Sequence, residues 1–160
     1  MEQSEELSLW LADGWLHASG DEIQRLLVED LREQVAQGVP LSNGIASLSK
    51  SERRAGDFGM EIAGTLLAPV LVELLKDFWK GYLKKLGEDA GGALADATTK
   101  GIKGWFVALL HKKEDDAALA QLKEKINQLA EKKKLTRKES LRLLEALGSP
   151  KLAQELSAKK

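Results

Sequence analysis

Few residues of this sequence have the types and spacing that catalysis requires. Asp57-Phe58-Gly59 has the letters of the metal-binding triplet of protein kinases, but no catalytic-loop motif accompanies it and 160 residues are too few for that fold. Residues 59–65 have the glycine spacing of a phosphate-binding loop. The lysine that contacts the phosphates is missing there, however, and the Glu61 carboxylate would repel them. We therefore interpret neither stretch as a nucleotide site.

The two histidines, His17 and His111, are the remaining candidates for metal or acid–base chemistry. Asp13 precedes His17 by four residues, which would place both side chains on one face of a helix, as metal ligands often are. Solvated polar residues share this spacing by chance far more often, and the chain has no cysteine that could complete a ligand set. We therefore expect a surface pair here, with no metal, no cofactor, no small-molecule substrate and no enzymatic activity.

A group of basic residues late in the sequence is the basis for a nucleic-acid hypothesis. It comprises Lys132, Lys133, Lys134, Arg137, Lys138 and Arg142. Gly148 lies between two predicted helices, where a helix-turn-helix has its turn glycine. In that register Leu144 falls where a small residue is usual and Gln154 where an apolar one is usual. DNA binding is therefore a minor alternative.

The central region combines aromatic residues and lysines, as do helices that lie at a membrane interface. The residues that we assign to membrane contact or assembly are Leu71, Leu75, Phe78, Trp79, Tyr82, Trp105 and Phe106. Lysines such as Lys80 and Lys103 lie beside them. A core helix that is covered on most sides also needs a wide apolar arc, and the sequence favours this core interpretation. Both interpretations hold if the helices are buried at rest and exposed on activation.

These residues must be positioned by helices, because the apolar spacing predicts an all-α protein throughout. We expect a bundle of about four main helices and a small C-terminal helical hairpin or triplet. Residues 1–54 are predicted to form an N-terminal helical hairpin and linker, residues 55–112 a central apolar helix pair, and residues 113–160 a basic helical tail.

Finer features are also predicted within these three parts. Turn-forming residues throughout 38–56 indicate a linker, and Thr136 with Glu139 has the spacing of a capping box. Asp21 is predicted to begin the second helix, and the apolar stripe of that helix is expected to contain Ile23, Leu26, Leu27, Leu31 and Val35.

Composition indicates a folded chain, and its charge is unevenly distributed, with an acidic beginning and a basic end. The apolar share is 43% and the charged share 31%, which is typical of a globular protein. Residues 1–50 contain nine acids and three bases, whereas residues 112–160 contain eight acids and thirteen bases. The acidic beginning lacks the basic start of a signal peptide, and no uncharged run reaches the roughly 18 residues of a spanning helix. We therefore expect a cytoplasmic protein, with recruitment to the inner membrane face if it engages membranes.

Residues 59–71 (GMEIAGTLLAPVL) and the glycine-linked helix pair that follows resemble bacterial HeLo-like helical cell-death effector domains. The resemblance covers residues 55–110. It rests on the general character of the sequence and includes no diagnostic motif that can be matched residue by residue, so it assigns no site residues. It implies a helical bundle that self-associates and damages membranes in bacterial defence.

Two main hypotheses follow. The first is a non-catalytic helical bundle that assembles with itself, or engages an anionic membrane, through its central helix pair. The second is a soluble adaptor whose basic tail docks another helical protein, and in that case residues 1–112 should fold without the tail.

Overall fold

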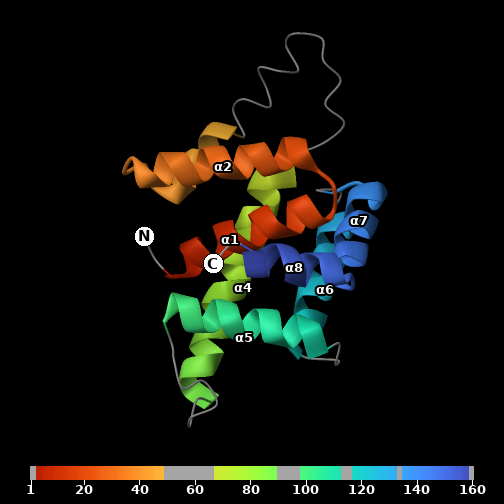
Figure 1. Ribbon diagram of the computed structural model, residues 1–160. Helices are drawn as coiled ribbons and strands as arrows, with labels where there is room; N and C mark the ends of the chain where they lie inside the picture. Colours follow the sequence, from red (N-terminus) through yellow and green to blue (C-terminus); the bar gives the residue numbers. More distant parts are fainter. Residues whose placement is uncertain (1–2, 49–66, 90–97, 113–116, 133–134, 159–160) are drawn as a thin grey trace.

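The described part of the chain is built from helices joined by turns and contains no strand, which confirms the all-α prediction (Figure 1). The computed structural model describes residues 3–48, 67–89, 98–112, 117–132 and 135–158. The named helices are α1 (Gln3–Ala18), α2 (Glu22–Ala36), α4 (Leu67–Asp89), α5 (Thr99–Lys112), α6 (Ala117–Glu131), α7 (Arg137–Leu147) and α8 (Pro150–Ala158). The Asp57-Phe58-Gly59 triplet and the glycine-spaced residues 59–65 lie outside the described residues.

Helix α1 is the central element of the fold, because every residue from Leu7 to Leu16 is buried. Its neighbours are α2, α4, α5, α7 and α8. Apolar residues occur on all sides of α1, as expected of a helix that is covered all round. Gly14 allows α8 to approach closely, since a Cβ at this position would lie 2.5 Å from a methyl carbon of Leu156.

Helix α4 crosses α1 and joins α5 through aromatic side chains. The rings of Trp79 and Phe106 lie 5.4 Å apart, and those of Tyr82 and Trp105 stack at 5.3 Å. Trp10 of α1 forms a T-shaped pair with Phe106, with the ring centroids 6.2 Å apart. Aromatic pairs of this geometry add about 0.5–1.5 kcal/mol each beyond the burial of their area. The cluster therefore ties α1, α4 and α5 together.

Helix α2 begins where the sequence predicts, and the predicted linker after it is partly wrong. The Asp21 carboxylate caps α2 by accepting a hydrogen bond from the Gln24 amide. Residues 41–48 are helical and bury Leu41, Ile45 and Leu48, whose spacing suits one helical face. Serine, asparagine and glycine between them obscured this period, so only residues 49–56 of the predicted linker lie outside the described structure.

The C-terminal helices pack on the body, which the sequence had left open. The expected capping box is present, because the Thr136 hydroxyl oxygen accepts a hydrogen bond from the Glu139 amide at 3.1 Å. The Trp15 indole Nε1 donates to the Leu143 carbonyl at 2.8 Å, and α8 lies against α1 and α5 (Figure 1). One hydrophobic core includes residues from all three predicted parts of the chain. Helices α7 and α8 therefore cover part of α1, which argues against the expectation, specific to the adaptor hypothesis, that residues 1–112 fold without the tail.

Replacing the two central tryptophans separately tests this core. Trp79→Ala should lower the free energy of unfolding by about 3–5 kcal/mol, because its side chain is fully buried. Trp105→Ala should cost clearly less, because Trp105 is only partly buried. Urea denaturation of both variants measures the difference. Equal small losses for both would contradict the core assignment of Trp79.

Candidate functional site

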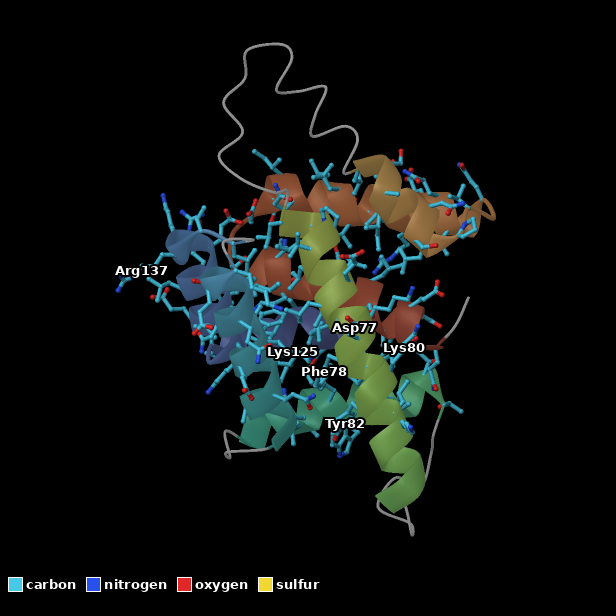
Figure 2. All side chains as sticks on the ribbon, turned by 180° about the vertical axis from the view of Figure 1, so that it is seen from behind. Asp77, Phe78, Lys80, Tyr82, Lys125 and Arg137 are labelled. Atoms are coloured by element: carbon cyan, nitrogen blue, oxygen red, sulfur yellow. The ribbon has the colours of Figure 1, made fainter. Side chains whose placement is uncertain are left out.

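The residues that we predicted for membrane contact or assembly lie in the core of the described structure. The buried members are Leu71, Leu75, Phe78, Trp79 and Phe106. Tyr82 and Trp105 are partly buried and pack against this core. Figure 2 shows Phe78 and Tyr82 on one side of α4, while the exposed Asp77 and Lys80 lie toward its other side. Contact of the buried residues with a membrane or another copy would require α4 and α5 to separate from α1.

The predicted basic residues lie at the surface wherever the structure describes them. Lys132, Arg137, Lys138 and Arg142 are exposed, and Lys133 and Lys134 lie outside the described residues. Figure 2 shows Arg137 projecting from α7 at the edge of the molecule. Helix α8, which would read DNA in the helix-turn-helix interpretation, instead buries its apolar side against α1 and α5.

Helix α7 presents a basic face that also contains an exposed leucine. Its buried side consists of Ser140, Leu143, Ala146 and Leu147. The capping box and the hydrogen bond from Trp15 to Leu143 fix the helix in this rotation. Leu141 is left 50% exposed between Arg137, Lys138 and Arg142. We call these four residues the α7 face.

Helix α2 presents a face of the opposite character. Val28 and Leu31 point into the core, as predicted, but Ile23 and Leu26 do not. Ile23 is 75% exposed and Leu26 is 60% exposed, which corrects their assignment to the buried stripe. The exposed acids Asp30 and Glu33 follow on the same helix. We call Ile23, Leu26, Asp30 and Glu33 the α2 face.

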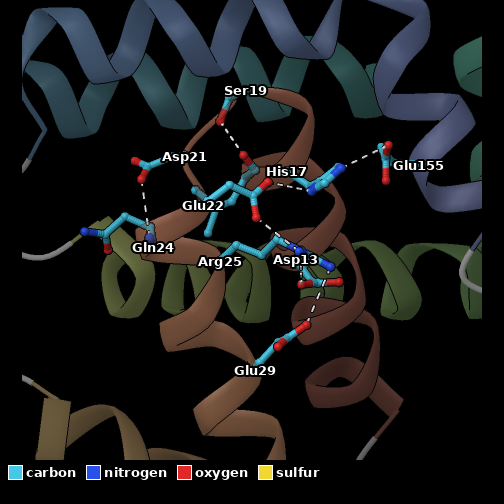
Figure 3. Close-up of polar contacts among 10 residues, drawn as sticks. Asp13, His17, Ser19, Asp21, Glu22, Gln24, Arg25, Glu29 and Glu155 are labelled. Carbon is cyan, nitrogen blue, oxygen red and sulfur yellow. Dashed lines mark hydrogen bonds and ion pairs between the residues drawn. The ribbon is translucent and has the colours of Figure 1, made fainter.

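A network of ion pairs behind the α2 face holds α1, α2 and α8 together (Figure 3). Arg25 Nε lies 3.3 Å from the Asp13 carboxylate, which is 1% exposed. The Arg25 guanidinium also lies 3.1 Å from Glu22 and 3.6 Å from Glu29. His17 lies between two carboxylates, at 2.7 Å from Glu22 and 3.2 Å from Glu155. The buried Asp13 carboxylate requires a cationic partner such as Arg25, because an isolated charge is costly to remove from water.

The network revises the interpretation of Asp13 and His17 as a surface pair. Asp13 is buried and pairs with Arg25, whereas His17 pairs with glutamates of α2 and α8. Among the described residues, no group of three or more histidine and carboxylate side chains is arranged to hold a metal ion. The signal that could have revealed the Asp13–Arg25 pair is an acid within the run Leu7 to Leu16, which apart from Ser8 is otherwise without polar side chains, since a buried acid must find a cation.

Comparison of the chain with protein-family models, with curated proteins and with solved structures found no match. Within the described residues, none of the helices combines the length and the apolar character needed to cross a membrane.

Removing the cation of the buried pair tests the network. Arg25→Met should lower the free energy of unfolding by about 3–5 kcal/mol, because the buried Asp13 carboxylate then loses its ion pair with Arg25. Glu29→Gln is the control and should cost less than about 1 kcal/mol, since Glu29 is 45% exposed. Chemical denaturation measures both values. Similar small losses would show that Asp13 does not depend on Arg25.

The capping glutamate of α7 gives a prediction about pH. Burial raises the pKa of Glu139, and the nearby Asp21 carboxylate adds to this effect, while the hydrogen bonds with Thr136 oppose it. A raised pKa in the folded state means that stability falls as pH rises from the unfolded-state pKa through the folded-state pKa. Glu139→Gln keeps an oxygen for Thr136 and removes the charge.

The variant should therefore gain stability relative to the wild type as pH rises from acidic to neutral. Urea denaturation at several pH values measures this difference, with Glu145→Gln, an exposed position of the same helix, as the control for loss of an acid. A difference between wild type and Glu139→Gln that does not vary with pH would contradict the assignment.

Proposed function

We propose that this chain is a non-catalytic helical protein that assembles with further copies of itself, with the α2 face of one copy seated on the α7 face of another. The observation that carries the proposal is the position of the exposed large apolar residues in the described structure. Ile23 and Leu26 belong to the α2 face, and Leu141 belongs to the α7 face. The apolar residues of the α2 face lie beside exposed negative charges, and Leu141 of the α7 face lies beside exposed positive charges.

Complementary charge explains why the two faces suit one another. Asp30 and Glu33 supply carboxylates on the α2 face, and Arg137, Lys138 and Arg142 supply cations on the α7 face. Opposite charges steer association and fix the relative orientation of two surfaces. Ile23 and Leu26 would meet Leu141 and remove apolar surface from water, which provides the driving force for association.

The two faces are different patches, so each copy offers one of each kind. A contact between unlike patches is heterologous and produces a ring if the rotation closes, or a filament if it does not. This keeps the self-association of the first hypothesis and moves it from the central helix pair to α2 and α7. The aromatic residues of α4 and α5 then stabilise the fold of each copy.

Charge reversal on one face at a time tests the proposal. One variant carries Asp30→Lys and Glu33→Lys, and a second carries Arg137→Glu and Lys138→Glu. Each variant alone should associate about tenfold or more weakly than the wild type, because like charges then oppose one another. Sedimentation velocity over a concentration series measures the association.

Mixing the two variants separates a charge-paired contact from general damage to the surface. The lysines of the first variant can pair with the glutamates of the second, so the mixture should associate more strongly than either variant alone. Glu73→Lys with Asp77→Lys is the matched control for the first variant, because it makes the same change in net charge at exposed positions of α4.

A wild-type chain that stays monomeric at every concentration would overturn the proposal. Binding of these faces to a different helical protein, as in the adaptor hypothesis, would then be the explanation to pursue. Weakening by the α4 control as strong as that by the α2 variant would equally contradict it.

A further inference from the structure

A cavity of about 840 Å³ lies between α1, α5 and α8, apart from the two charged faces. Its volume lies within the range typical of small-molecule sites. The lining residues are Glu6, Trp10, Thr98, Thr99, Lys100, Lys103, Gly104, Val107, Leu156 and Ser157. Neither the ion-pair network nor the proposed assembly uses this cavity.

One part of the lining is apolar. It consists of the Trp10 ring with the aliphatic side chains of Val107 and Leu156, one from each of the three helices. Trp10 is 3% exposed, and its indole N–H has no hydrogen-bond partner among the described residues. The Trp79 indole N–H, which does not line the cavity, is likewise buried with no partner in the described structure, so it is the apolar surface of this part of the lining that bears on a ligand.

The other part of the lining is cationic. Lys103 Nζ lies 3.8 Å from the Glu6 carboxylate and 5.6 Å from the centre of the Trp10 ring. Lys100 is exposed and lies one turn earlier on α5. Two lysines therefore face one glutamate. The positive end of the α5 dipole adds to this excess, because α5 begins at Thr99.

We infer that this cavity binds an anionic amphiphile, meaning a molecule with a carboxylate or phosphate head and an aliphatic chain. The head would lie at Lys100 and Lys103, and the chain would lie along Trp10, Val107 and Leu156. A small hydrophilic anion would leave the apolar part of the cavity unfilled, and a cationic amphiphile would meet the two lysines. The lining thus selects both parts of the ligand. This inference does not depend on self-assembly.

Gly104 provides a means of filling the cavity without disturbing the helices. A Cβ built at Gly104 meets no atom within 4 Å, so a larger side chain has room to enter the space that Gly104 lines. Gly104→Leu should fold at least as stably as the wild type, since leucine also favours the helix more than glycine does. Gly81 on α4 is the matched control, because it is exposed and its Cβ position is equally open.

The experiment is isothermal titration with dodecanoate below its micelle concentration. Wild type and Gly81→Leu should bind it saturably, and Gly104→Leu should lose binding while its thermal midpoint is unchanged or higher. Lys100→Glu should weaken binding about tenfold or more, through loss of a charge-assisted contact with the head. Acetate and dodecyltrimethylammonium, which each lack one of the two required features, should not bind.

Vesicles of phosphatidylglycerol distinguish the source of such a ligand. Vesicle binding that Gly104→Leu abolishes would indicate a lipid taken from a bilayer, and dodecanoate binding without vesicle binding would indicate a free amphiphile. Either result supports the site. Unchanged dodecanoate binding by Gly104→Leu, absence of binding by the wild type, or equal binding of dodecyltrimethylammonium would overturn it.

Discussion

Burial of every α1 residue from Leu7 to Leu16 is the constraint on which the rest of the structure depends. A helix that is apolar on all sides must be covered on all sides, and five other helices provide that cover. The neighbouring helices must then supply a charge partner for the acid within α1 and must fit closely against its surface. Asp13 receives Arg25, and Gly14 makes space for Leu156. Because Arg25 must point toward α1, the rotation of α2 about its own axis is fixed.

That rotation accounts for the exposed apolar residues of α2. In an α-helix a residue two positions away lies on roughly the opposite side, so an inward Arg25 places Ile23 outward. The exposed apolar group is thus a consequence of satisfying a buried acid on another helix. Figure 1 shows α2 and α5 on opposite sides of α1 and α8, so the α2 face and the α5 cavity can be occupied without competition.

The sequence was sufficient to predict the fold class and several helix boundaries, because periodicity, caps and glycines act over short distances. Asp21 and Thr136 are examples, since each caps the helix that follows it. The position of α1 at the centre was missed because periodicity identifies an apolar side of a helix and does not say how many neighbours will cover it. The Asp13–Arg25 pair was missed for the same reason, since it joins two helices whose rotation depends on tertiary packing. The cavity requires residues of α1, α5 and α8 together, and no local pattern connects them.

The hydrogen bond from Trp15 to Leu143 spans 128 residues of the chain, and its two ends belong to helices that must meet before α1 is covered. During synthesis on the ribosome, α1 therefore emerges long before α7 and α8 exist. Its leucines and tryptophans remain in contact with water, or with a chaperone, until the later helices arrive. The entropy of closing so long a loop slows this meeting and favours concerted folding over stepwise folding from the N-terminus. A nascent chain that stalls before α8 would expose α1, whose residues from Leu7 to Leu16 are all buried in the folded protein.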